Sequence, residues 1–256
     1  MKAATRRGLL GAALGATGAG VSGCDRIANS PEANRSLNLA EGLNFHVQRL
    51  LLGRRALARE YPASAISPDF RANGTVNPDS EDYQAHVAGG FKDWRLEIGG
   101  LVERPLQLSL DELRQAPSRT QITRHDCVEG WSSIGKWKGA RLGPLLDRAG
   151  VKPQAKYVAF FCADTLELTL DGTGDYYETI DLADARHPQT VLAYEMNDRP
   201  LPVAHGAPIR LRLERQLGYK MAKYVMRIEL IDSFAGLGLG KGGYWEDRGY
   251  QWYAGI

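Results

Sequence analysis

Cysteine is scarce in this chain of 256 residues, which has three, at positions 24, 127 and 162. No two of them stand as CxxC, and the CxxCH of attached haem is absent. No histidine pair has the spacing of a zinc finger. These absences exclude a zinc finger, a c-type cytochrome and a cysteine-ligated iron–sulfur protein.

A strong charge of one sign is also missing, as is a long apolar run beyond the N-terminus. The net charge is +2 with both signs interspersed, which argues against a nucleic-acid-binding surface. No such run reaches the length of a membrane span. The contents of 43% hydrophobic and 24% charged residues are typical of a globular protein with one sizeable domain or two small ones.

The N-terminus has the pattern of an export signal. Lys2, Arg6 and Arg7 precede a run of small and apolar residues over 8–23, as in the charged and apolar regions of a signal peptide. The paired arginines indicate a twin-arginine signal. Residues 21–24 resemble a bacterial lipobox, with an ordinary cleaved signal as the alternative. We expect 1–23 to be a signal peptide and the mature protein to be periplasmic, either free or lipid-anchored through Cys24.

The rest of the chain divides into three parts. Residues 24–36 are polar and predict a tether. Apolar residues at helical spacing, with arginines between them, predict an amphipathic helix within 37–62 that ends before Pro62; its basic face is either solvated or rests on a membrane. Short strands and helices without βαβ spacing predict a single α+β domain over 63–256.

Several elements of this domain are predicted from local patterns. Ser109 and Glu112 form a capping box at a helix over 110–115, and Gly150 is expected to end a helix over 142–149. The tail after Phe234 is expected to be an ordered surface loop. Strands are expected at 94–98, at the segment after 99–100, and at 121–124, 157–161, 209–213 and 225–231.

Cys127 has polar and partly cationic neighbours. Residues 124–132 read RHDCVEGWS, and Lys136, Trp137 and Lys138 follow. A thiol in such surroundings is more readily a thiolate, the form that attacks electrophiles or binds a metal. A cysteine that only packs in the core is the alternative.

Residues 124–132, with 137–139 and Leu142, resemble the cysteine loop of the sulfite oxidase superfamily of molybdenum enzymes. Residues 156–160, 205–210 and 218–223 extend the resemblance, which covers about residues 66–231. The most similar branch holds the periplasmic protein-methionine-sulfoxide reductase catalytic subunits. The resemblance implies a mixed-sheet, barrel-like fold and a cofactor of molybdenum held by molybdopterin.

The resemblance also implies roles for single residues. Cys127 corresponds to the thiolate ligand of molybdenum, a role that suits a soft donor. Arginine and lysine are donors suited to the phosphate of the pterin. The positions that match residues holding the pterin and its phosphate are Asn73, His205, Arg210, Met221, Ala222 and Lys223.

Aromatic and thiol positions complete the expected site. Trp137 matches an active-site tryptophan. Tyr176, or its neighbour Tyr177, matches a phenol that can donate a hydrogen bond to an oxo group, with a tyrosine closing a strand end as the alternative. Cys162 stands where the reductases have a threonine, and is either a cofactor contact or a small residue that fits.

The implied reaction is oxygen-atom transfer to or from a small oxo substrate such as a sulfoxide, an N-oxide or an oxyanion. Trp131 and Ser132 replace an arginine pair that holds sulfite in sulfite oxidases, which counts against that dianion. A separate cytochrome, membrane cytochrome b or soluble cytochrome c, is expected to exchange electrons with the chain. We expect a monomer, because the chain ends soon after the core.

Three alternatives remain at the level of function. The first is a sulfite dehydrogenase, and the second is a non-catalytic exported binding module. The third is a thiol redox protein that uses Cys127 and Cys162. A titratable dithiol and activity without molybdenum would distinguish the third.

Overall fold

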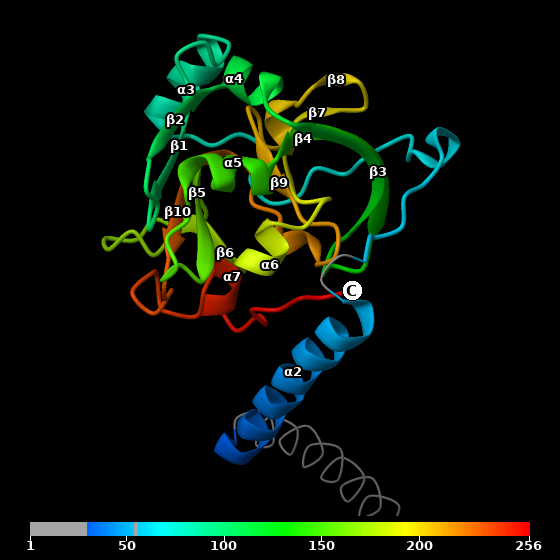
Figure 1. Ribbon diagram of the computed structural model, residues 1–256, viewed down its shortest axis with the longest axis vertical. Helices are drawn as coiled ribbons and strands as arrows, with labels where there is room; N and C mark the ends of the chain where they lie inside the picture. Colours follow the sequence, from blue (N-terminus) through cyan, green and yellow to red (C-terminus); the bar gives the residue numbers. More distant parts are fainter. Residues whose placement is uncertain (1–29, 54–55) are drawn as a thin grey trace, which may run out of the picture. The chain divides into compact units, whose positions relative to one another are not determined.

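The computed structural model describes residues 30–53 and 56–256 (Figure 1). The chain divides into two compact units, residues 1–51 and 52–256. The predicted signal peptide, the Cys24 anchor and the first part of the tether lie outside the described residues. Within the described ranges, no helix is both long and apolar enough to cross a bilayer.

The N-terminal helix has different bounds from those predicted. It is α2, Pro31–Leu52, so it begins inside the predicted tether and ends well before Pro62. Gly53 follows with φ of +64°, a left-handed conformation that commonly ends helices. Further on, the Tyr61 N–H donates to the Ile122 carbonyl at 2.9 Å. Pairing with a strand therefore replaces the helical hydrogen bonds there.

The larger unit contains two sheets. The first has the order β2-β1-β10-β5-β6, with β1 parallel to β10 and the other pairs antiparallel. Its strands are β1 (Arg95–Gly100), β2 (Leu106–Ser109), β5 (Tyr157–Thr165), β6 (Asp175–Asp181) and β10 (Val225–Ile231). The strands predicted at 94–98, after 99–100, at 157–161 and at 225–231 are confirmed.

The second sheet is antiparallel, with the order β3-β4-β7-β8 and β9 paired to β7. Its strands are β3 (Ser118–Asp126), β4 (Ser132–Arg141), β7 (Val191–Met196), β8 (Arg199–Pro200) and β9 (Arg210–Arg212). Figure 1 shows β1, β2 and β10 on one side of this unit and β3 on the opposite side. The predicted mixed-sheet α+β class is confirmed.

Short helices connect the strands. The capping box of Ser109 and Glu112 is present at the start of α4, and Gly150 ends α5 with φ of +71°, both as predicted. The helices are α3 (Glu81–Ala88), α4 (Leu110–Gln115), α5 (Leu142–Ala149), α6 (Leu182–Ala185) and α7 (Tyr244–Asp247), with 3-10 turns η1 (Ala63–Ala65), η2 (Val203–His205) and η3 (Gly218–Lys220).

The main core draws on both sheets and on α4 and α5. Leu96 and Ile98 of β1, Phe160 of β5 and Leu211 of β9 belong to one buried cluster. Alternate residues of β1 are buried, as expected for a strand with one face on a core. This shared core holds the two sheets together, and the site described below receives residues from both.

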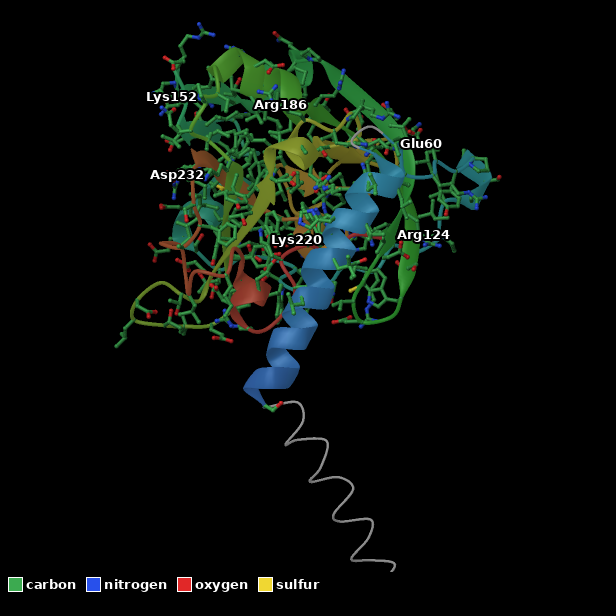
Figure 2. The ribbon with its side chains drawn as sticks, turned by 60° about the horizontal axis from the view of Figure 1, so that its bottom comes forward. Glu60, Arg124, Lys152, Arg186, Lys220 and Asp232 are labelled. Atoms are coloured by element: carbon green, nitrogen blue, oxygen red, sulfur yellow. The ribbon has the colours of Figure 1, made fainter. Side chains whose placement is uncertain are left out.

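The C-terminal tail is not the surface loop that was predicted. It contains α7, and Tyr244, Glu246 and Asp247 are buried. Glu246 Oε1 accepts a hydrogen bond from Lys220 Nζ at 2.5 Å, and Lys220 lies inside the domain (Figure 2). Glycine and aromatic composition alone suggested a loop, whereas these long-range polar contacts fasten the tail to the core.

Candidate active site

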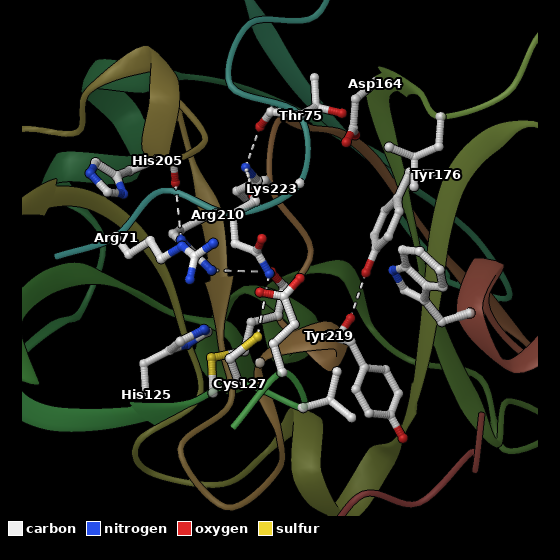
Figure 3. Close-up of a pocket in the computed structure, with 18 of the residues that line it drawn as sticks. Arg71, Thr75, His125, Cys127, Asp164, Tyr176, His205, Arg210, Tyr219 and Lys223 are labelled. Atoms are coloured by element: carbon white, nitrogen blue, oxygen red, sulfur yellow. Dashed lines mark hydrogen bonds between the residues drawn. The ribbon is translucent and has the colours of Figure 1, made fainter. Parts of the chain in front are cut away.

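One pocket of about 480 Å³ collects most of the predicted site (Figure 3). Its walls come from the segment before α3, the loop after β3, the ends of β5, β6 and β9, and the tail. The predicted residues that line it are Asn73, Cys127, Tyr176, His205, Arg210, Met221 and Lys223. Positions far apart in sequence therefore converge around one space.

Cys127 presents its thiol to this pocket. It follows β3 in a tight turn in which the Gly130 N–H donates to the Cys127 carbonyl at 3.0 Å. Gly130 has φ of +87°, which an L side chain rarely adopts. Asn73 Nδ2 donates to Sγ of Cys127 at 3.3 Å. The turn and the amide fix the position of the sulfur.

Arg210 and Lys223 give the pocket a positive side. Arg210 donates to the carbonyls of His205 at 3.2 Å and Met221 at 3.4 Å, and its buried Nε has no partner. Lys223 Nζ donates to the carbonyl of Asn73 at 2.6 Å and to that of Thr75. In the described part of the chain, neither cation forms an ion pair with a carboxylate.

Burial and neighbouring positive charges lower the pKa values of these groups. Burial, with Arg212 nearby, lowers the pKa of Arg210 to about 9. Burial and then Arg210 lower the pKa of Lys223 to about 8 and that of His205 to about 4. Because Arg210 and Lys223 form no ion pair in the described part of the chain, a bound anion would stabilise them here.

His125, two residues before Cys127, is held neutral. Arg212 Nη1 donates to its Nδ1 at 3.1 Å, so the ring proton lies on Nε2. Burial and Arg212 lower the pKa of His125 well below its usual value. Gly218 makes room for the ring, because a Cβ there would lie 2.4 Å from it.

Two further groups line the pocket beyond Lys223. Asp164 is buried with its Oδ1 unpartnered, and burial raises its pKa to about 6. Tyr176 donates its hydroxyl to the Tyr219 carbonyl at 2.5 Å. The Tyr176 proton is thereby committed to a backbone oxygen, which favours the alternative of a structural tyrosine. Tyr177 points away and donates to Asp247 at 2.7 Å, as alternation along β6 requires.

Three predicted residues do not line this pocket. Trp137 is fully buried, with the guanidinium carbon of Arg210 5.2 Å and that of Arg212 4.4 Å from its ring centroid. Ala222 is also fully buried, and its carbonyl accepts from the Leu211 N–H at 2.8 Å. Both lie in the layer behind the pocket, because alternate residues of paired segments face away from it.

Cys162 is the third predicted residue that does not line this pocket. It belongs to β5 opposite Val225 and lines a second cavity of about 350 Å³. Burial raises the pKa of its thiol well above the usual value. Both Cys162 and Cys127 are free thiols. Their separation into two cavities and the protonated state of Cys162 count against the dithiol alternative.

Sequence reasoning missed several lining residues. Arg71 and Asp164, both of which line the pocket, were seen only as neighbours of the predicted residues Asn73 and Cys162. The tail was predicted to be a surface loop, so the pocket residues that it contributes were not predicted. The residues it brings to the pocket are Tyr244, Trp245 and Tyr250.

The residues present fit a molybdopterin cofactor. The pocket combines one thiol, which suits a soft metal, with an unpartnered arginine nitrogen and a lysine, which suit a phosphate. Tyr176 and Leu166 supply apolar surface. The donor set therefore matches a group with a metal at one end and an anion at the other.

Comparison with known proteins agrees with this chemistry. Residues 84–235 match the oxidoreductase molybdopterin binding domain. The YedZ1 subunit of Azospira oryzae, named in relation to protein-methionine-sulfoxide reductase, is 38% identical over 235 residues, covering 92% of this chain and 81% of that protein. The protein-methionine-sulfoxide reductase catalytic subunit MsrP of Xanthomonas axonopodis is 37% identical over 145 residues, 54% of this chain and 45% of the relative.

Among solved structures, the sulfane dehydrogenase SoxCD of Paracoccus pantotrophus is similar with a TM-score of 0.49 and 26% identity, over 56% of this chain and 39% of that one.

The matched domain spans more than half of the chain and includes Cys127, His205, Arg210 and Lys223. The chain therefore belongs to the oxidoreductase molybdopterin binding domain family, within the sulfite oxidase superfamily, and is an oxidoreductase whose cofactor is molybdenum held by molybdopterin.

Proposed function

We propose that the chain reduces a neutral oxo substrate of the sulfoxide type, with electrons delivered by a separate cytochrome. The observation that carries this proposal is one pocket in which the Cys127 thiol faces cations on one side and aromatic rings on another. Such a pocket offers sites for a metal, for the phosphate of its pterin and for an apolar substrate group. The names of the relatives support sulfoxide reduction.

In this proposal different side chains bind different parts of the cofactor. Cys127 is the metal ligand, and the Asn73 amide holds its sulfur. Arg210 and Lys223 hold the pterin phosphate, and His205 and Met221 line the wall beside them. When bound, the molybdenum cofactor supplies exchange of an oxygen atom together with two electrons.

The reaction consumes protons as well as electrons. A sulfoxide that takes up two electrons and two protons leaves as a thioether, and its oxygen leaves as water. Asp164 lines the pocket with an unpartnered oxygen and a pKa near neutrality. It is the carboxyl best placed to pass protons inward, because a pKa close to the working pH suits proton transfer.

Sulfite oxidation is the second candidate, and Arg71 is the observation that favours it. Its guanidinium carbon lies 5.7 Å from the Trp131 ring centroid, and both residues line the pocket. This arginine comes from a different segment than the pair of the sulfite oxidases, yet it brings a cation to the same pocket. A dianion needs such a partner.

The cellular setting completes the proposal. Export by the twin-arginine route fits a protein that receives its cofactor before crossing the membrane. A periplasmic location, with or without lipid at Cys24, would allow contact with a membrane cytochrome b or a soluble cytochrome c. We also propose a monomer, for which light scattering of the purified protein is the test.

The deciding experiment compares two assays of the molybdenum-loaded protein. Methyl phenyl sulfoxide is offered with a reduced viologen dye, and sulfite is offered with ferricyanide. We expect turnover of the sulfoxide, and in Arg71→Ala less than a threefold change in that rate. Turnover of sulfite alone, lost in Arg71→Ala, would reverse the assignment.

A further inference from the structure

The tail after β10 supplies an aromatic wall to the pocket. Trp245 and Tyr250 line the pocket and stack with ring centroids 5.4 Å apart and 28° between planes. Tyr219, from η3, meets Tyr250 edge to face at 5.1 Å. The tail lies beyond residues 84–235, the part that matches the shared domain. Trp245 and Tyr250 therefore lie outside the matched segment, whereas Tyr219 lies within it.

Two buried anchors directly follow Trp245 in the chain. Glu246, the next residue, accepts from Lys220 Nζ at 2.5 Å. Asp247 accepts from the Tyr177 hydroxyl at 2.7 Å and from the Leu239 N–H at 2.8 Å. Both carboxylates are buried. An aromatic ring fixed in this way presents a rigid surface, so little conformational entropy is lost when a ligand packs against it.

The far side of the wall is fixed as well. Tyr219 donates its hydroxyl to the Gln251 carbonyl at 2.7 Å. The Tyr250 N–H donates to the Trp245 carbonyl at 3.0 Å. Arg248 bridges to Glu167, another pocket residue, at 2.7 Å. The three rings therefore hold one arrangement at one side of the pocket.

We infer that this wall, formed by Tyr219, Trp245 and Tyr250, binds the apolar substituent of the oxo substrate and selects substrates that carry one. This inference rests on the proposed function and specifies its substrate class. Flat aromatic faces attract apolar and sulfur-bearing groups, while a small charged oxyanion gains nothing from them. The preferred substrate is a sulfoxide with an aryl or large alkyl group.

The first test measures selectivity in the molybdenum-loaded protein. In Trp245→Ala, kcat/KM for methyl phenyl sulfoxide is expected to fall by about tenfold or more, through KM, and that for dimethyl sulfoxide by less than about threefold. Trp245→Phe should restore most of the preference. Leu239→Ala is the matched control, since its side chain lies on the same tail and is 62% exposed.

The second test does not depend on turnover. Binding of methyl phenyl sulfone, which has the same substituent and is not reduced, is followed by calorimetry on the same proteins. Trp245→Ala should weaken it by about tenfold, and Leu239→Ala should not. An equal fall in kcat/KM for both sulfoxides in Trp245→Ala, or an unchanged affinity for the sulfone, would overturn the inference that the wall binds the substrate. Sulfone binding that needs Trp245, without reduction of any sulfoxide, would instead overturn the proposed function alone.

Discussion

At the scale of single residues, the pocket depends on groups whose charge is set by burial. Among the residues that the structure describes, Arg210 and Lys223 form no ion pair with a carboxylate, and His125 and His205 stay neutral beside them. Burial also favours the neutral form of Asp164, and for a carboxylic acid this raises the pKa. The effect of burial on Asp164 can be measured through the pH dependence of the free energy of unfolding.

Asp164→Asn should change how the stability of the cofactor-free protein depends on pH. The pKa of Asp164 is about 6 in the folded chain against an ordinary 3.8, so wild-type stability falls as pH rises through this interval. Asparagine does not ionise and lacks that loss. The free energy of unfolding of the variant, relative to wild type, should rise by up to about 3 kcal/mol between about pH 4 and pH 7.

Urea unfolding at the two pH values is the measurement. Asp232→Asn, which alters an exposed carboxylate at the surface, serves as the control (Figure 2). An Asp164→Asn variant whose stability runs parallel to wild type at both pH values would show that the buried carboxyl is not protonated there.

At the scale of elements, β4 and β7 approach each other closely at Gly139. A Cβ at Gly139 would lie 2.3 Å from the Leu192 carbonyl oxygen and 2.6 Å from the Ala193 Cα. Both are backbone atoms, so the strands themselves would have to move apart. The pairing shifts register at this point, which brings the backbones close.

Gly139→Ala should therefore lower the free energy of unfolding by about 3 kcal/mol. The matched control is Gly99→Ala on β1, where an added Cβ meets no atom within 4 Å. That change should stay within about 1 kcal/mol of wild type. Chemical denaturation followed by circular dichroism compares the two, and equal effects would contradict the steric account.

Local patterns were enough to predict most strands and the caps. Alternation in β1, the capping box at Ser109 and the glycine after α5 act within a few residues, so the sequence alone reveals them. The end of α2 was predicted too late in the chain, because Gly53 follows the helix in a left-handed conformation and the backbone at Tyr61 pairs with β3 instead of continuing the helix. The place of Trp137 depends on which layer β4 faces, which is also a tertiary property.

The site itself was predictable through family resemblance rather than through physics. Cys127, Arg210 and Lys223 lie far apart in sequence, and only the fold brings them together. Asp164 and Trp245 were not predicted, because their places in the pocket depend on how the end of β5 and the anchored tail fold, which are tertiary properties.

At the scale of the whole molecule, a buried ionic cluster joins three remote segments. Lys220 of η3 contacts Glu178 of β6 and Glu246 of α7, and all three are essentially inaccessible to solvent. Burial, and then Glu246, raise the pKa of Glu178 well above its usual value. One ammonium facing two carboxyls therefore favours a proton on Glu178.

Lys220→Met should destabilise the protein by about 3–5 kcal/mol, because it leaves buried carboxyls without their cation. Glu178→Gln mimics the protonated acid and keeps the acceptor for the Thr179 N–H, 2.8 Å away. It should change the free energy of unfolding by less than about 1 kcal/mol. Urea unfolding distinguishes them, and a loss in Glu178→Gln as large as in Lys220→Met would mean that Glu178 is ionised.

The most direct test of the whole account is the sulfur environment of molybdenum in the loaded protein. X-ray absorption at the molybdenum edge is compared between wild type, Cys127→Ser and Cys162→Ser, with pterin content measured in each. Loss of one sulfur neighbour in Cys127→Ser alone is the result expected from a thiol that faces the pocket. An unchanged sulfur count in Cys127→Ser, or a loss in Cys162→Ser, would contradict the assignment of Cys127 as the metal ligand.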